Sequence, residues 1–149
     1  MNILLDIDGV LVITPNWKPV ELLDDGFMKF NQKLIDNLNI LQSVTDANII
    51  VTSSHREYFN IQKLTDVFRN RGIKFKTLEK LDDSNNTRAE DIELWLSCNK
   101  DERYIIIDDD NSINDLSKEI KKNWVKTMPL IGFNQEKLVE ALKIYTSVA

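Results

Sequence analysis

The sequence predicts an α/β domain in which helices cover both faces of a central parallel sheet. Three short apolar runs, at 3–5, 48–51 and 104–107, are too brief for helices and rich in β-branched residues, as buried strands are. Segments with the periodicity of amphipathic helices lie between them, and strands that alternate with helices favour a parallel sheet. Each run ends in acidic or hydroxyl side chains, which such a sheet would gather at one edge.

Five elements are predicted in the first half of the chain. A strand at 2–6 leads into a loop at 12–27, whose prolines, glycine and aromatic residues indicate an ordered flap. A helix at 30–45, a strand at 48–52 and a helix at 57–70 follow. The helical stripes consist of Phe30, Leu34, Leu38 and Leu41 in the first helix and Phe59, Leu64, Val67 and Phe68 in the second.

Strands and helices also alternate in the second half. Gly72 is a stop signal for the helix before it, and a short strand is expected at 73–77. The run Asn85-Asn86-Thr87 offers the start of a helix that continues to about residue 98. Asn134 can cap the last helix. The remaining predicted elements are a strand at 103–108, a helix at 112–122, a strand at 123–127 and a helix at 134–147.

Length and composition limit the possible functions. With 149 residues, 42% hydrophobic and 29% charged, the chain is predicted to form one ordinary globular domain over 1–149. The net charge of −5 gives no general attraction to nucleic acid or to an anionic membrane. Cys98 is the only cysteine, which excludes an intramolecular disulfide and a cysteine-based zinc site and favours the cytoplasm. No apolar stretch is long enough to span a membrane, so no membrane partner is expected.

Acidic residues follow the first and the fourth predicted strands of the chain, at 2–6 and 103–108. Two aspartates lie close together in the segment Asp6-Ile7-Asp8-Gly9, and two ionised carboxylates at this spacing need a cation or a shared proton. A second acidic run, Asp108-Asp109-Asp110, ends the strand at 103–108, and Thr52 ends the strand at 48–52. Side by side, these ends would form an all-oxygen site that suits Mg²⁺ and leaves room for a phosphate.

The segment Asp6-Ile7-Asp8-Gly9-Val10-Leu11 resembles the first motif of the haloacid dehalogenase (HAD) superfamily of phosphohydrolases. The resemblance covers nearly the whole chain, because the remaining motifs follow in the expected order. It implies a HAD-like, Rossmann-like three-layer sandwich with a central parallel sheet. Neither position at which relatives insert a cap domain has room for one here, so no cap is expected.

The resemblance also implies a role for each motif residue. Asp6 would attack phosphorus and become an aspartyl-phosphate, and Asp8 would protonate the leaving oxygen and later activate water. The Thr52 hydroxyl would bind the phosphoryl group, and Arg88 would stabilise the nucleophile and the phosphate. The resemblance also implies Mg²⁺ as the metal, with Asp6, Asp8, Asp108 and Asp109 as its ligands.

Two positions depart from the common pattern of the superfamily. The basic residue of the third motif is more often lysine, so Lys80 and Lys76 remain alternatives to Arg88. The acidic motif is a triplet, 108–110, so the choice of the members that ligate the metal directly stays open.

The substrate class is suggested by resemblance alone. A site without a cap favours substrates that bring their own bulk, such as a phosphoprotein or a nucleic-acid end. The stretch Thr52-Ser53-Ser54-His55-Arg56 resembles a variant in a capless HAD subgroup that includes domains associated with RNA repair. Ser53, His55 and Arg56 are therefore expected to bind substrate, although Ser53 or Ser54 is also a candidate for the cap of the next helix.

Three functions are consistent with these motifs. The first is a Mg²⁺-dependent phosphatase that hydrolyses a phosphomonoester through an aspartyl-phosphate. The second has the same chemistry in a nucleic-acid-end (polynucleotide) phosphatase or a phosphotransferase. The third is a HAD-like module that binds a partner without catalysis, which the retention of the four acidic motif residues disfavours.

Overall fold

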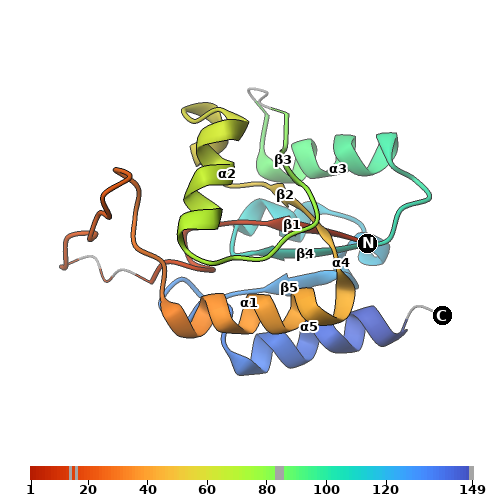
Figure 1. Cartoon of the computed structure of the whole chain (residues 1–149). Helices are drawn as coiled ribbons and strands as arrows, with labels where there is room; N and C mark the ends of the chain where they lie inside the picture. Colours follow the sequence, from red (N-terminus) through yellow and green to blue (C-terminus); the bar gives the residue numbers. More distant parts are fainter. Residues whose placement is uncertain (14, 16, 83–85, 148–149) are drawn as a thin grey trace.

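Five parallel strands form the central sheet of the protein (Figure 1). The structure is a computed structural model that describes residues 1–149 except 14, 16, 83–85 and 148–149. The strands are β1 (Asn2–Leu5), β2 (Asn48–Val51), β3 (Leu78–Lys80), β4 (Tyr104–Asp108) and β5 (Trp124–Lys126). Their order is β3-β2-β1-β4-β5, and every neighbouring pair is parallel. β1 therefore lies in the middle, with β2 and β4 on its two sides.

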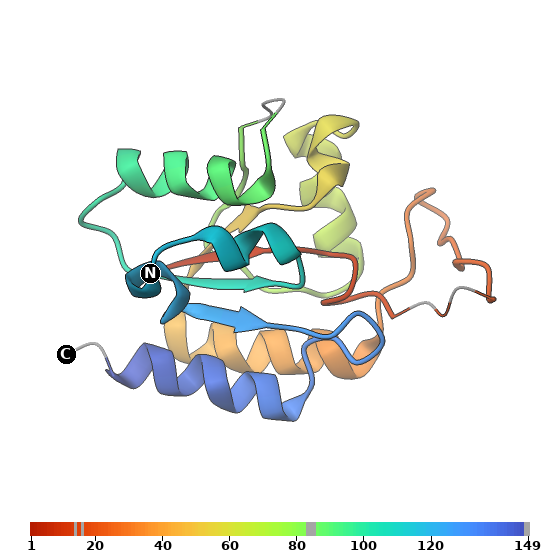
Figure 2. The same cartoon turned by 180° about the vertical axis from the view of Figure 1, so that it is seen from behind.

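Helices cover both faces of this sheet, which gives three layers (Figures 1 and 2). The helices on one face are α1 (Gln32–Thr45), α2 (Ile61–Asn70) and α5 (Gln135–Ser147). Those on the other face are α3 (Arg88–Cys98), the 3₁₀ helix η2 (Asn111–Asp115) and the short α4 (Lys118–Lys121). The predicted α/β, Rossmann-like architecture is thus confirmed.

Alternation along β1 explains why both faces must be covered. Ile3 and Leu5 lie in the core that α1, α2 and α5 close, whereas Leu4 lies in the core under α3 and η2. All three side chains are fully buried. A central strand with apolar side chains on both faces is stable only between two helical layers, which is the arrangement that the apolar runs predicted.

Short polar side chains define where the helices begin. The side chain of Asn31 accepts hydrogen bonds at the start of α1, and those of Thr87 and Asn134 do so at the starts of α3 and α5. Each of these helices begins within three residues of its predicted start. Thr87 therefore acts as the cap within the run predicted to start α3, and Asn85 of that run lies outside the described residues.

Two predicted elements between β2 and β3 were misplaced. The helix predicted at 57–70 is split into the 3₁₀ helix η1 (Ser54–Glu57) and α2, because the Asn60 side chain accepts from the backbone of Lys63 and starts a new helix. The strand predicted at 73–77 begins instead at Leu78. Side-chain amides of α1 bind the backbone of Lys74 and keep that segment out of the sheet.

The helix predicted at 112–122 is also wrong, because it is two short helices. Leu116 has an extended backbone that ends η2, and the hydroxyl of Ser117 accepts from the backbone N–H of Ile120 to start α4. The buried side chains of Ile113 and Leu116 still pack under the sheet. The apolar pattern therefore identified the buried face correctly, whereas the capping serine decided the backbone path.

The segment between β1 and α1 projects from the body as a flap (Figure 1). Its described residues contain turns and isolated bridges but no helix, and no cap domain is evident in the described parts of the chain. Arg71 clamps the base of the flap: its guanidinium binds the Asp25 carboxylate at 2.6 Å and the carbonyl oxygens of Phe27 and Met28. This ion pair lowers the pKa of Asp25, so the clamp stays charged well into the acidic range.

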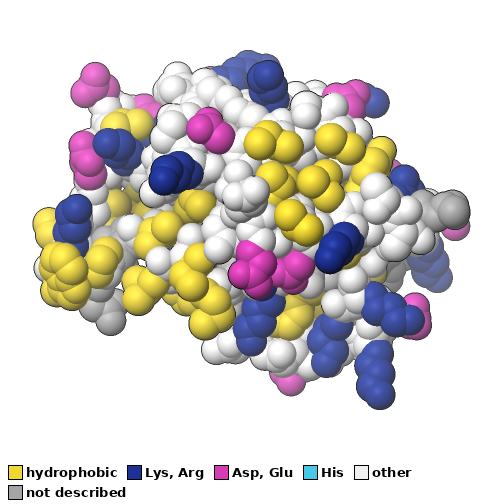
Figure 3. Space-filling model, turned by 90° about the horizontal axis from the view of Figure 1, so that it is seen from below, with side chains coloured by type: hydrophobic (Ala, Val, Ile, Leu, Met, Phe, Trp, Pro, Cys, Tyr) yellow, Lys and Arg dark blue, Asp and Glu magenta, His cyan; other side chains and the backbone are white. Residues whose placement is uncertain are grey.

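Apolar side chains gather on the outer surface of the flap and of the helices α1 and α5 (Figure 3). Among the exposed apolar residues of these segments are Trp17, Val20, Leu22, Ile40, Val44 and Val139. In the described ranges, none of the helices combines the length and the apolar character that crossing a bilayer requires.

Candidate active site

The register of the sheet brings three predicted site residues into one row. Leu5 of β1 pairs with Val51 of β2 and with Ile107 of β4, so the residues that follow these three stand side by side at the carboxyl edge. Those residues are Asp6, Thr52 and Asp108. Backbone hydrogen bonds from Thr52 to Leu5 and from Asp6 to Ile107 hold the row in place.

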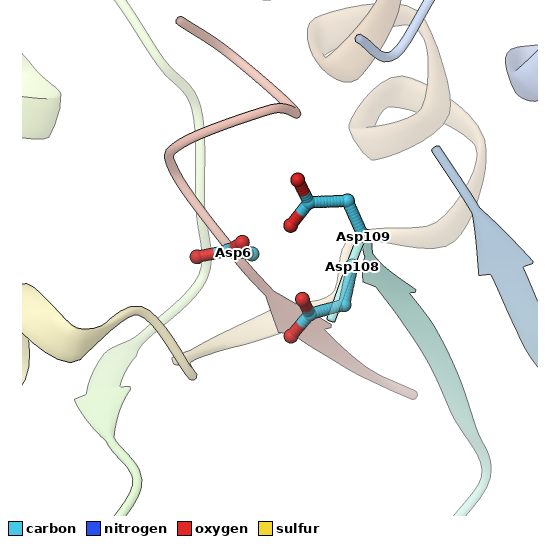
Figure 4. Close-up of side chains that lie close together, drawn as sticks. All are labelled: Asp6, Asp108 and Asp109. Carbon is cyan, nitrogen blue, oxygen red and sulfur yellow. The ribbon is translucent and has the colours of Figure 1, made fainter. Parts of the chain in front are cut away.

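Three carboxylates converge at this edge (Figure 4). One oxygen from each of Asp6, Asp108 and Asp109 lies within 4.8 Å of the others. Asp6 and Asp108 are buried, and Asp109 is partly buried. Gly9 makes room for Asp109, because a Cβ atom at Gly9 would lie only 2.2 Å from an Asp109 carboxylate oxygen. The glycine that lets the chain turn after β1 thus also shapes the carboxylate cluster.

Hydrogen bonds fix the orientation of the two buried carboxylates. Oδ1 of Asp6 accepts from the backbone N–H of Ile7 at 2.8 Å. Oδ1 of Asp108 accepts from the N–H of Asp110 at 3.0 Å, and its Oδ2 accepts from the Thr52 hydroxyl at 2.8 Å. Thr52 is fully buried, so its hydroxyl is part of the wall of the site. These donors leave one Asp6 oxygen directed at the other charged groups.

Arg88 provides the positive charge among these acids. It is the first residue of α3, and its Nη1 lies 2.9 Å from Asp108 Oδ1 and 3.2 Å from Asp6 Oδ2. Its side chain is 12% exposed, which strengthens the attraction because little water screens it. Burial lowers the pKa of Arg88, but the carboxylates of Asp108, Asp6 and Asp110 outweigh this effect and raise the pKa above its ordinary value.

Burial disfavours the ionised forms of Asp6 and Asp108. Desolvation raises the pKa of Asp6 well above its usual value, and the charge of Asp108 raises it further, although Arg88 acts in the opposite direction. Desolvation likewise raises the pKa of Asp108, against the opposing effects of Arg88 and Thr52. The charge of Arg88 therefore does not fully offset the effect of burial on the pKa values of these two acids. Perturbed pKa values of this kind are typical of a functional site.

The other two candidate cations lie elsewhere. Lys80 donates from Nζ to the carbonyl oxygens of Arg56 and Phe59. Lys76 is exposed and precedes β3, so it lies toward the opposite edge of the sheet from the site. Of the three basic residues considered, Arg88 is the one that contacts the acids.

The structure also shows which members of the acidic triplet 108–110 lie in the site. Asp110 caps η2 by accepting from the N–H of Ser112 at 2.9 Å, and hydrogen bonds from Ser112 lower the pKa of Asp110 in spite of its partial burial. Its carboxylate lies 4.0 Å from Arg88, at the margin of the site. Asp108 and Asp109 are the members of the triplet that join Asp6 in the cluster.

Asp8 stands apart from the three clustered carboxylates. Its carboxylate is 54% exposed, and its Oδ2 lies 2.9 Å from Nε2 of His55. The structure therefore does not bring this carboxylate into the cluster of Asp6, Asp108 and Asp109. The role of Asp8 as a metal ligand stays a prediction. His55, which we expected near the substrate, is in direct contact with a candidate catalytic acid, and its contact with substrate stays a prediction.

The other two expected substrate-binding residues are buried in the fold. Ser53 caps η1 by accepting from the N–H of His55. Arg56 is 4% exposed, and its guanidinium binds Asp91 at 2.8 Å and the carbonyl oxygens of Thr52 and Ser53. Contrary to our expectation for Arg56, its guanidinium faces the protein interior, where it ties the end of β2 to α3.

The cluster has the composition of a site for a hard divalent cation. Its ligand atoms are carboxylate oxygens, which Mg²⁺ prefers, and they come from two adjacent strands that hold them rigidly. Burial raises the pKa values of Asp6 and Asp108, and the charge of Asp108 raises that of Asp6 further, so a bound cation would favour the ionised forms of both acids. Asp6, Asp108 and Asp109 therefore fit a magnesium ion.

Two features of the site could not be predicted from the sequence patterns that we considered. The contact between Asp8 and His55 joins residues 47 positions apart, and the pair of Arg56 and Asp91 joins residues 35 positions apart. Both depend on where the loop after β2 turns. An arginine next to a strand end looks the same in sequence whether it faces the solvent or the interior.

One family is found when the chain is compared with models of protein families. Residues 2–138 match the family described as HAD domain in Swiss Army Knife RNA repair proteins. The match spans every element that contributes to the site, from β1 to η2. Comparisons with curated proteins and with solved structures find no match.

Proposed function

The chain belongs to the family of HAD domains in Swiss Army Knife RNA repair proteins, and we propose that it is a Mg²⁺-dependent phosphatase that works through an aspartyl-phosphate on Asp6. The observation that carries this proposal is the convergence of Asp6, Asp108 and Asp109 around Arg88 at the carboxyl edge of the sheet. Membership of the family supports a phosphatase-type or RNA-repair-related function in general.

Asp6 is the proposed nucleophile. A carboxylate oxygen of Asp6 forms a bond to phosphorus while the bond between phosphorus and the leaving oxygen breaks. The N–H of Ile7 holds the other carboxylate oxygen, which directs the attack from a fixed side chain. Water then attacks the phosphorus of the aspartyl-phosphate, which releases inorganic phosphate and regenerates the carboxylate.

Charge compensation is the main task of the surrounding residues. Phosphoryl transfer depends chiefly on positioning and on stabilising the phosphoryl oxygens. Arg88 lies between Asp6 and Asp108 and offers further N–H groups to a phosphate. When bound, Mg²⁺ would supply Lewis-acid stabilisation of the phosphoryl oxygens, with Asp6, Asp108 and Asp109 as its protein ligands. We keep Asp8 as a fourth candidate ligand and Thr52 as a candidate donor to the phosphoryl group.

Asp8 is the proposed acid and base. It follows the nucleophile by two residues and leaves the strand at the Gly9 turn, where Gly9 has a φ of +75°. In the first step it donates a proton to the leaving oxygen, and in the second it accepts one from the attacking water. Its exposed position suits a group that must meet a leaving group arriving from solvent.

A nucleic-acid end is the substrate that we favour. The family description names RNA repair, and the described residues show no cap that would enclose a small molecule. A terminal phosphate of RNA would place its phosphoryl group on Asp6 while the rest of the strand stays outside. A phosphoprotein is the second bulky substrate, and a phosphotransferase would use the same two half-reactions with another acceptor. The cytoplasm remains the expected compartment, in line with the single cysteine.

Removal of divalent metal is expected to abolish the activity. With an excess of EDTA, hydrolysis of p-nitrophenyl phosphate should fall to background, because the acids then retain their excess negative charge. Addition of Mg²⁺ beyond the chelator should restore it. Undiminished hydrolysis in EDTA by protein shown to be free of metal would contradict the proposed metal dependence.

The substrate class is tested by direct comparison of phosphorylated ends. We expect oligoribonucleotides with a 3′- or 5′-phosphate to have a higher kcat/KM than mononucleotides or phosphopeptides. A higher kcat/KM for phosphopeptides would redirect the proposal to phosphoproteins. Absence of any hydrolysis across the panel, with Mg²⁺ present, would favour the binding module without catalysis.

A further inference from the structure

Among the described residues, one side-chain hydrogen bond can orient the Asp8 carboxylate. The backbone of the turn is well fixed, because the Ile7 carbonyl oxygen accepts from the N–H groups of Val10, Leu11 and Val12. The carboxylate itself is about half exposed, and Nε2 of His55 at 2.9 Å is its one hydrogen-bond partner among the described contacts. An exposed aspartate without such a partner would distribute over several rotamers.

The imidazole ring of His55 is itself held by aromatic neighbours. The ring lies edge-to-face with Phe27 at a centroid distance of 4.9 Å and tilted against Phe59 at 6.1 Å. Phe27 and Phe59 also pack edge-to-face at 5.2 Å, and Phe27 is almost fully buried. The ring therefore has little freedom to rotate away from Asp8.

The backbone that carries His55 is anchored on both sides. The Ser53 hydroxyl caps η1, and the carbonyl oxygen of His55 accepts from the N–H groups of Tyr58 and Phe59. The buried guanidinium of Arg56, the next residue, binds the carbonyl oxygens of Thr52 and Ser53. These hydrogen bonds fix the position of the loop and therefore of the imidazole ring at the carboxyl edge of the sheet.

We propose that His55 is a positioning residue that holds the Asp8 carboxylate for proton transfer to the leaving group, an inference that rests on the proposed phosphatase function. The proton that Asp8 transfers must lie on the carboxyl oxygen that faces the substrate. Oδ2 then remains an acceptor, so Nε2 carries the hydrogen and donates to Oδ2. This bond leaves Oδ1 as the oxygen that carries the proton to the leaving group and receives one from water. His55 would act through Asp8 and would not exchange a proton with the substrate.

The contact between His55 and Asp8 is expected to affect proton transfer rather than stability. Pairs as exposed as this one contribute little to stability, so removal of the imidazole N–H should leave unfolding almost unchanged. A misplaced general acid, in contrast, slows only those steps that need its proton. Dependence on the leaving group therefore separates positioning of Asp8 from a general structural role.

Two variants of His55 separate the hydrogen bond from the packing. His55→Phe keeps a ring between Phe27 and Phe59 but has no donor. His55→Gln loses the ring but places an amide N–H close to the position of Nε2. Both are compared with the native protein in Mg²⁺, with glycerol 2-phosphate as an alkyl ester and p-nitrophenyl phosphate as an aryl ester. The parameter is kcat/KM, because it reports the steps up to release of the leaving group.

For His55→Phe, we expect kcat/KM on the alkyl ester to fall on the order of 10²-fold, the usual contribution of a general acid. The value on the aryl ester should change little, because p-nitrophenolate leaves without needing a proton. His55→Gln should recover much of the loss on the alkyl ester. An equal fall on both esters, no fall on either, or failure of His55→Gln to exceed His55→Phe would overturn the role of His55. Lack of hydrolysis of both esters by the native protein would instead overturn the proposed function.

Discussion

Replacement of Asp6 by asparagine is expected to abolish turnover and, at the same time, to stabilise the metal-free protein. Asparagine has nearly the same shape but offers no carboxylate oxygen to attack phosphorus. Turnover should fall by more than about 10³-fold, as is typical when a nucleophile is removed. Retained activity of Asp6→Asn in Mg²⁺ would exclude Asp6 as the nucleophile.

The expected gain in stability follows from the raised pKa of Asp6. Burial and the charge of Asp108 disfavour the ionised form in the folded state, so folding at neutral pH must work against this carboxylate. Its stabilising contribution is complete below the ordinary pKa of 3.8 and is lost as the pH rises through the higher pKa of the folded state. The neutral amide avoids this loss, so at pH 7 the variant should be more stable by at least about 1 kcal/mol.

The measurement is thermal unfolding in EDTA at pH 7 and at pH 4. The advantage of Asp6→Asn should be clear at pH 7 and should shrink at pH 4, where the native carboxyl is protonated. Asp101→Asn is a suitable control, because Asp101 is an exposed acid outside the site. A variant less stable than the native protein at pH 7 would show that the pairing of Asp6 with Arg88 outweighs burial.

Replacement of Arg88 by methionine is expected to have the opposite combination, a loss of both activity and stability. Methionine keeps the apolar stem but removes the guanidinium that contacts Asp6 and Asp108. Two buried carboxylates would then face each other without this positive charge, and breaking a buried ion pair costs about 3 kcal/mol. Activity should fall by roughly 10²- to 10³-fold, because a preorganised donor to the phosphoryl oxygens is lost.

Conditions that neutralise the acids should reduce this defect. The loss of stability in Arg88→Met should be larger at pH 7 than at pH 5, since protonation relieves the repulsion between Asp6 and Asp108. Added Mg²⁺ should also restore part of the stability. Arg88→Lys is the matched control and should retain more activity than Arg88→Met, since the charge is kept. Native stability and turnover in Arg88→Met would place the essential cation elsewhere.

The sequence predicted the centre of the fold and of the site because both depend on local patterns that the sheet preserves. The apolar runs of β1, β2 and β4 end at equivalent positions, so parallel pairing alone aligns Asp6, Thr52 and Asp108. The predicted ends of these three strands lie within one residue of those observed. Where hydrophobic periodicity and strand register decide the outcome, one sequence is sufficient.

The periphery was harder to predict because side chains distant in sequence decide it. β3 begins at Leu78 because amide side chains of α1 bind the backbone of Lys74. The sequence of residues 73–77 gives no indication of that contact. The inward turn of Arg56 depends on Asp91 of α3 in the same way. The pairing of His55 with Asp8 depends on an aromatic cluster that includes Phe27 of the flap.

The most direct test of the account is a crystal structure of the protein with Mg²⁺ and beryllium fluoride. A BeF₃⁻ group should be bonded to a carboxylate oxygen of Asp6, with one Mg²⁺ bound by Asp6 and by at least one of Asp108 and Asp109. Arg88 should contact the fluorides, and the Asp8 carboxylate should stay on His55. A BeF₃⁻ group on another residue, or a Mg²⁺ bound away from this cluster, would contradict the proposed mechanism.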